Sequence, residues 1–186
     1  GATAPATVSR FDPETATFAN ASPLATPRGL PAVVRTDGGL VVVLAGTDAW
    51  SGAPASAVVE AWDPFTAAFV TLDEPLPTPV SHVAAVPLAD GRVLVAGGRN
   101  VAGAALRSAS VVDPTQSGDD VVEPTGDLLV ARSSPAAVRF VTGEVLVAGG
   151  TDAAGGKRGW LGGYDPVSGP FFSLPGGAPP PRSHSP

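Results

Sequence analysis

The chain has 186 residues, no cysteine and a formal net charge of −6. This length suffices for one domain with a buried core, and the lack of cysteine excludes disulfides, thiolate metal sites and cysteine nucleophiles from this segment. Basic residues are scattered singly except at Lys157-Arg158, and no apolar run approaches the ~18 residues of a membrane helix, so we expect neither nucleic acid binding nor membrane insertion.

Glycine and proline punctuate the whole sequence. The 23 glycines and 21 prolines separate short apolar runs, as a protein of many strands and tight turns requires. No stretch keeps an amphipathic helical spacing for three turns. The sequence therefore predicts an all-β fold with almost no helix.

A glycine-ended apolar segment occurs three times, at residues 40–47, 92–98 and 144–150. Each copy is rich in valine and leucine and too short for a helix, which predicts a buried strand that runs into a tight turn. We expect these segments to be the inner strands of successive wedges. Aligned on Gly46, Gly97 and Gly149, the first copy has Thr47 where the others have a second glycine, Gly98 and Gly150.

An Asp-Pro pair provides a second landmark. It occurs as Phe11-Asp12-Pro13, Trp62-Asp63-Pro64, Val112-Asp113-Pro114 and Tyr164-Asp165-Pro166, at intervals of 51, 50 and 52 residues. Both landmarks give a period of about fifty residues, which is typical of one propeller blade per repeat.

Each repeat contains the same predicted elements in the same order. In the central copy these are strands at 81–88, 92–96, 107–112 and 121–123, with an Asp-Gly turn after the first and a variable loop after the second. We therefore divide the chain into the end of a unit (1–25), three whole units (26–76, 77–127 and 128–178) and the start of another (179–186).

A pair of aromatic residues marks the third and fourth strands of most units. Seven residues separate Phe11 from Phe18, Trp62 from Phe69 and Tyr164 from Phe171, as expected for cross-strand partners around a short turn. In the central unit we expect Val112 and Val121 to take these places.

Together these motifs resemble the kelch repeat, and the bacterial form with Asp-Gly-Arg-Val-Leu-Val-Ala-Gly-Gly and Tyr-Asp-Pro is especially similar. The resemblance covers essentially the whole chain and implies a β-propeller of four-stranded antiparallel blades, about three complete and one partial at each end. The implied structural repeat positions are Gly46, Gly97, Gly98, Gly149, Gly150, Trp62, Tyr164, Asp63, Asp113 and Asp165.

The two ends of this array would each leave an apolar sheet face in water. A repeat without its neighbour loses about 1.5–3 kcal/mol for every valine or leucine that stays exposed. We therefore expect the chain to be part of a longer propeller or to close against another chain, with the remaining blades, an oligomeric ring or a protein partner covering the ends.

The loops after the second strands, at 47–57, 99–107 and 151–159, are the expected binding face. Aromatic and basic residues on loops held by a rigid scaffold are typical of binding surfaces. The candidate binding residues are Trp50, Arg99, Asn100, Lys157, Arg158 and Trp160. Asp48, Asn100 and Asp152 follow the second strands and are expected to cap turns, with calcium or ligand binding as the alternative.

His82 and His184 occupy equivalent places in two units, so a structural role in the repeat is favoured over metal binding or acid–base chemistry. We identify no catalytic residues, metal ligands or cofactor, and expect a non-catalytic interaction module or scaffold. The alternatives are a structural subunit of a larger secreted assembly and a sector of a galactose-oxidase-like enzyme whose copper site lies elsewhere. Family analogy implies an extracellular, cell-surface or periplasmic location.

Overall fold

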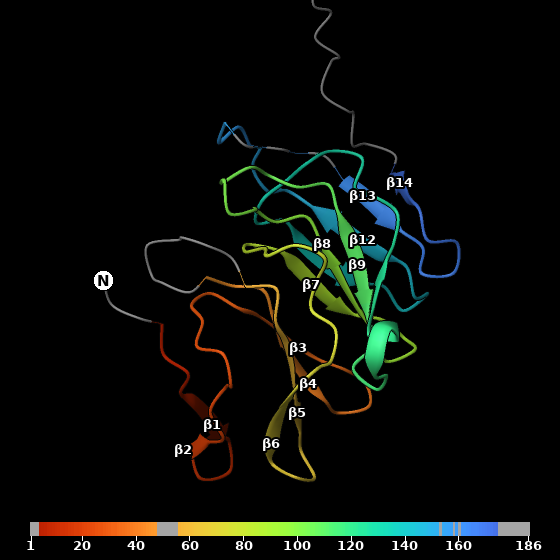
Figure 1. Ribbon diagram of the computed structural model, residues 1–186. Helices are drawn as coiled ribbons and strands as arrows, with labels where there is room; N and C mark the ends of the chain where they lie inside the picture. Colours follow the sequence, from red (N-terminus) through yellow and green to blue (C-terminus); the bar gives the residue numbers. More distant parts are fainter. Residues whose placement is uncertain (1–3, 48–55, 153, 158, 160, 175–186) are drawn as a thin grey trace, which may run out of the picture.

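The computed structural model describes residues 4–174 except 48–55, 153, 158 and 160 (Figure 1). These residues form one two-stranded and three four-stranded antiparallel sheets, and the described chain has a single 3-10 turn, η1 at Gly118–Asp120. The strands are β1 Val8–Asp12, β2 Thr17–Ala21, β3 Ala32–Arg35, β4 Val41–Leu44, β5 Val59–Asp63, β6 Ala68–Thr71, β7 Ala84–Pro87, β8 Val93–Ala96, β9 Ala109–Val112, β10 Val122–Pro124, β11 Ala136–Arg139, β12 Val145–Ala148, β13 Leu161–Tyr164 and β14 Phe171–Ser173.

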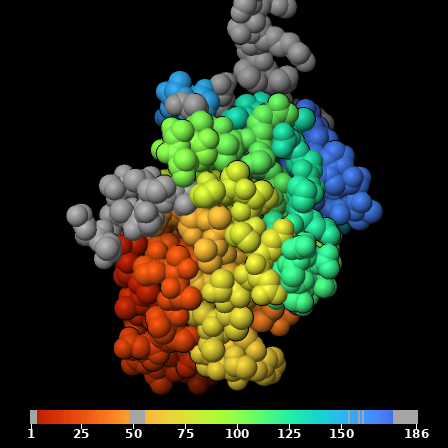
Figure 2. All heavy atoms as spheres, viewed as in Figure 1, coloured from red at the N-terminus to blue at the C-terminus, as the bar shows by residue number. Residues whose placement is uncertain are grey.

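Each four-stranded sheet follows the order of the chain. The sheets are β3-β4-β5-β6, β7-β8-β9-β10 and β11-β12-β13-β14, and β1-β2 forms the smaller sheet at the N-terminal end. Figure 2 shows the units side by side in sequence order, from red through yellow and green to blue. The fold is all-β and propeller-like, as the repeats predicted.

The first strands of neighbouring sheets lie side by side, since β7 contacts both β3 and β11. The first strand of each sheet is therefore the one nearest the axis around which the sheets are arranged. The glycine-ended segments β4, β8 and β12 are the second strands, as the order of elements in each repeat predicted, and each has a strand on either side within its sheet. Since neighbouring strands are antiparallel, the loops after β4, β8 and β12 share one edge of the array, which we call the loop rim. The turns at 36–40, 88–92 and 140–144 share the opposite edge, the turn rim.

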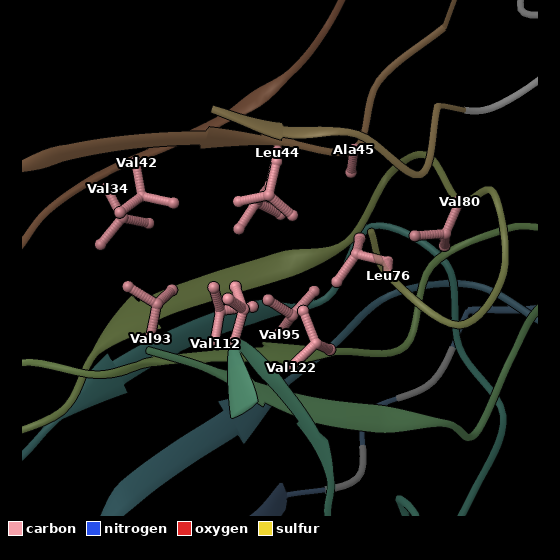
Figure 3. Close-up of a cluster of buried hydrophobic side chains, with 12 residues drawn as sticks. Val34, Val42, Leu44, Ala45, Leu76, Val80, Val93, Val95, Val112 and Val122 are labelled. Carbon is pink, nitrogen blue, oxygen red and sulfur yellow. The ribbon is translucent and has the colours of Figure 1, made fainter. Parts of the chain in front are cut away.

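The core lies between successive sheets. Valines and leucines of β3 and β4 face those of β8, β9 and β10 across the first interface (Figure 3). The second interface joins β7, β8 and β9 to β12, β13 and β14 and includes Leu94, Tyr164 and Phe171. Each fully buried valine or leucine stabilises the packing by about 1.5–3 kcal/mol.

Alternation along the strands gives every sheet two rows of side chains. In the two interfaces above, the forward row packs on the following sheet and the backward row packs on the preceding one. The forward rows are Val34-Val42-Ala61, Val86-Leu94-Val111 and Val138-Leu146-Gly163-Phe172. The backward rows are Phe11-Phe18, Val41-Trp62-Phe69, Val93-Val112-Val122 and Val145-Tyr164-Phe171.

The central backward row corrects one register. Val112 pairs with Val122, whereas we expected Val121. The turn between these strands is longer than in the other units and contains η1, so spacing alone places the partner one residue early.

The glycine landmark also needs a correction. Thr47 bridges Gly29 as Arg99 bridges Ser81, which makes Thr47 the equivalent of Arg99 and not of a second glycine. Gly46 therefore corresponds to Gly98 and Gly150. Ala45 takes the place of Gly97, and its φ of 57° lies in the same left-handed region as the 67° of Gly97.

The second glycine of each copy is required by close packing. A Cβ at Gly46, Gly98 or Gly150 would lie 2.7 Å from the carbonyl oxygen of residue 29, 81 or 133, in a backbone conformation that already favours glycine. In this way the end of each second strand abuts the segment that leads into the first strand.

The Asp-Pro landmark is a capped turn in every unit. The Oδ1 atoms of Asp12, Asp63, Asp113 and Asp165 each accept a hydrogen bond from the backbone N–H two residues later, at 2.8–2.9 Å. These backbone donors hold the pKa of Asp12 and Asp165 below the usual value, because they stabilise the ionised carboxylate.

Candidate binding face at the loop rim

The described loops of the central and third sheets are short hairpins at the loop rim. Arg99 forms bridges with Ser81 and Ala105, and the equivalent Thr151 forms bridges with Ser133 and Lys157. Each loop is thus tied both to the segment before the first strand and to its own returning arm. The same backbone scheme serves two different loop sequences.

Asn100 and Asp152 cap these hairpins. Asn100 Oδ1 accepts hydrogen bonds from the backbone N–H groups of Ala102 and Ala104, both at 3.0 Å. Asp152 Oδ1 does the same for Ala154 and Gly156, at 3.0 and 2.7 Å. The turn-capping role predicted for Asn100 and Asp152 is confirmed, and their side chains stiffen the loops from within.

Capping leaves the tips of the hairpins in solvent. Val101 is 63% exposed at the tip of the central loop, and Lys157 is exposed on the returning arm of the third. Arg99 and Asn100 are half-buried at the base of the central loop. The structure therefore places Arg99, Asn100 and Lys157 on one rim, on successive sheets.

The remaining candidates, Trp50, Arg158 and Trp160, lie outside the described residues, as do Asp48 and His184. Within the described part of the chain, no group of three or more acidic or histidine side chains is arranged to hold a metal ion. No helix in the described residues is long and apolar enough to cross a membrane.

His82 occupies a structural position at this rim, as its repeat placement predicted. Its φ of 56° matches those of Leu30 and Ser134, at 49° and 53°, just before the first strands. The carbonyl oxygen of His82 accepts a 2.7 Å hydrogen bond from the N–H of Ser134, which joins neighbouring units. Its Nδ1 lies 3.0 Å from Ser81 Oγ.

Burial lowers the pKa of the His82 imidazole, and the charge of Arg99 lowers it further. Both effects disfavour the protonated ring, so His82 is neutral at pH 7.

A buried ion pair near the same rim escaped the sequence analysis. Arg28 and Glu60 form a salt bridge in which both side chains are fully buried. The Glu60 carboxylate also accepts hydrogen bonds from Ala25 N at 2.7 Å and Thr26 N at 3.1 Å, and Arg28 Nη1 donates to Val58 O at 2.6 Å. An acidic residue inside the apolar run 57–61 was the signal available in the sequence.

The pair anchors the segment before β3 to strand β5. Arg132 occupies the corresponding place in the third unit, where it is fully buried and its Nη1 donates to Gly149 O at 3.0 Å. An arginine here binds backbone carbonyls at the loop rim, which is a structural task.

A separate hollow of about 240 Å³ lies at the turn rim and not beside these loops. It is lined by acidic and basic side chains. Among these, Arg92 forms a salt bridge with Asp90, with 2.7 Å between Nη2 and Oδ2. This hollow contains none of the candidate binding residues.

No family model and no curated protein matches the sequence. Among solved structures, the chain is similar to that of YjhT, with a TM-score of 0.72 and 16% sequence identity over 91% of this chain and 52% of that one. The chain has a propeller-like all-β fold. It spans about half the length of that structure, and at this identity the likeness concerns the fold alone.

Proposed function

We propose that the chain is a non-catalytic kelch-type repeat module that binds a protein partner through its loop rim. The observation that carries this proposal is the pair of matching, internally capped hairpins on successive sheets. They expose Val101 and Lys157 to solvent, while β-bridges at the base of each hairpin join it to the segment before the first strand.

Rigid loops suit such a role because little conformational entropy is lost when they bind. The caps use the side-chain oxygens of Asn100 and Asp152 inside the loops, so the loops offer exposed apolar and cationic groups instead. An aliphatic tip and a lysine on the same rim fit a partner surface that is partly apolar and partly acidic.

Site-specific photo-crosslinking in extract of the source cells tests this proposal. A photoreactive residue at position 101 or 157 is expected to give a discrete protein adduct. The same residue at Phe65 or Val167, each 94% exposed at the turn rim, serves as the control and is expected to give none. Adducts only from the turn-rim positions would contradict the proposal.

Loop variants then separate binding from folding. Asn100→Ala removes the cap and is expected to weaken capture of that partner. Asn100→Asp keeps the acceptor oxygen, as Asp152 provides one in the next unit, and this variant is expected to capture the partner as well as the unaltered chain does. Equal capture by both variants would show that the hairpin geometry does not matter.

A second candidate function is that of a structural subunit in a larger assembly. It is favoured by the low charge of the chain, since only 15% of its residues are charged. The galactose-oxidase-like alternative would place copper outside this segment. That alternative predicts stoichiometric copper in the intact protein, whereas the binding module that we propose predicts none, so copper analysis of the intact protein separates the two.

A further inference from the structure

One place near the loop rim is occupied by different side chains in the three four-stranded sheets. It lies between the segment before the first strand and the third strand. The residues of that segment just before the bridge to the loop are Arg28, Val80 and Arg132. The facing residues of the third strands, which pair with 43, 95 and 147 of the second strands, are Glu60, Ser110 and Gly162.

The first sheet fills this place with charge. Arg28 and Glu60 form their buried salt bridge there. The guanidinium of Arg28 also donates to two carbonyl oxygens, that of Val58 at 2.6 Å and that of Thr26 at 3.2 Å. The side chains of this pair therefore occupy the space between the two segments.

The central sheet has lost both members of the pair. Val80 and Ser110 stand in their places, and both are smaller and uncharged. A hollow of about 300 Å³ lies here, lined among others by Leu76, Thr78, Val80, Val95, Ser108 and Ser110. Thr78 and Ser108 are the equivalents of Thr26 and Val58, the two residues whose carbonyls Arg28 binds. The hollow is thus the space that the ion pair fills in the first sheet.

The lining of the hollow determines which group can enter it. None of its lining residues is charged, so neither a cation nor an anion would find a counter-charge inside, and burial of an unpaired charge is costly. Leu76, Val80 and Val95 provide apolar walls and are themselves 4–6% exposed. A neutral apolar group therefore fits best, and the volume is at the lower end of the ~300–1,000 Å³ of small-ligand sites.

We propose that this hollow receives an aliphatic side chain of the protein that binds the loop rim. The inference rests on the proposed function and identifies where the apolar part of that partner docks. Leu106 lines the hollow and belongs to the returning arm of the hairpin that carries Val101. The hollow is therefore continuous with the loop rim, and one partner can contact both.

Filling the hollow tests the proposal in the whole chain. Ser110→Leu fills it with an uncharged side chain, and Val80→Arg combined with Ser110→Glu rebuilds the ion pair of the first sheet. Each variant is expected to weaken capture of the partner that crosslinks at position 101 by at least about tenfold. Ser117→Leu, at an exposed serine on the turn rim of the same unit, is the matched control and is expected to capture normally. Circular dichroism and urea unfolding show that the variants are folded.

A second measurement needs no partner. The methyl resonances of Val80 and Val95 are followed by NMR while N-acetyl-leucinamide, a neutral capped leucine, is added to the unaltered chain. We expect a saturable shift of both residues, which Ser110→Leu abolishes. The capped amides of lysine and glutamate carry a charge and are expected to cause no shift.

The outcomes separate this inference from the proposed function. Absence of any adduct at positions 101 and 157 contradicts the proposed function itself. If adducts form but both folded, filled variants still capture the partner normally, only the role of the hollow is overturned. Equal methyl shifts with the leucine, lysine and glutamate amides would overturn the aliphatic assignment.

Discussion

A covered interface and an uncovered end of this molecule contain aromatic pairs in equivalent registers. Tyr164 and Phe171 pack with ring centroids 4.9 Å apart, and Phe11 and Phe18 do so at 5.0 Å. The first pair is buried against the central sheet, and the second lies in solvent. Local pairing is thus a property of each unit, whereas burial depends on the unit beside it, as in other repeat proteins.

The largest difference is expected between these two aromatic pairs. Phe171→Ala should lower the free energy of unfolding by about 3–5 kcal/mol, because it leaves a cavity in the second interface. Phe18→Ala removes only a cross-strand contact and should cost about 1 kcal/mol or less. Urea unfolding of both variants in dilute protein measures the contrast. Equal losses would show that the first sheet is covered.

The forward rows provide a second matched pair. Leu94 is fully buried and Leu146, its equivalent in the third sheet, is half-buried. Leu94→Ala should cost about 2–5 kcal/mol, and Leu146→Ala about half as much. The midpoints of urea unfolding report both values. A larger loss for Leu146 would contradict the assignment of the open face.

Ala45 tests the corrected glycine register. Its left-handed backbone costs an alanine about 1–2 kcal/mol. Ala45→Gly removes this cost but also removes a methyl group that is buried in the first interface and contributes about 0.8 kcal/mol. The net change should therefore stabilise the protein by at most about 1 kcal/mol. The reverse change in the next unit, Gly97→Ala, should destabilise the protein, since the new Cβ would lie only 2.7 Å from the carbonyl oxygen of Arg132. Thermal unfolding measures both shifts. Destabilisation by both changes would mean that packing of the Ala45 methyl outweighs backbone strain.

The smallest expected effect is a pH dependence at the loop rim. The pKa of His82 lies below the 6.5 of a free imidazole, so the unfolded chain binds more protons as the pH falls through 6.5. The contribution of His82 to the free energy of unfolding is therefore fully present above pH 6.5 and is lost as the pH falls below that value. His82→Asn, which tolerates the left-handed backbone, should remove this part of the decline. Identical pH profiles for the two proteins would show that His82 is not responsible.

The sequence predicted the fold well because its landmarks reflect local chemistry. Asp63 caps its own turn, and Trp62 pairs with Phe69 across that turn, so their spacing follows directly from the hairpin. The glycine register failed at Ala45, since residue type suggested one alignment and backbone conformation requires another. The partner of Val112 was misplaced because the longer turn holds η1.

The candidate site was less accessible from sequence. The caps by Asn100 and Asp152 follow from local turn chemistry and were predicted correctly. The Arg28–Glu60 pair joins residues 32 positions apart and was missed, because nothing local in the sequence identifies the partner of a buried charge. The binding roles of Arg99 and Lys157 remain predictions, since they depend on a partner.

The most direct test of this account uses the lack of cysteine in the chain. Single cysteines at Val34, Val86 and Val138 sample the same place in three successive forward rows. In dilute native protein, a thiol reagent should modify Val138→Cys at a rate close to that of a free thiol. It should modify Val34→Cys and Val86→Cys at least about a hundredfold more slowly, since these need local opening. Equal rates at all three positions would contradict the side-by-side stacking of the sheets.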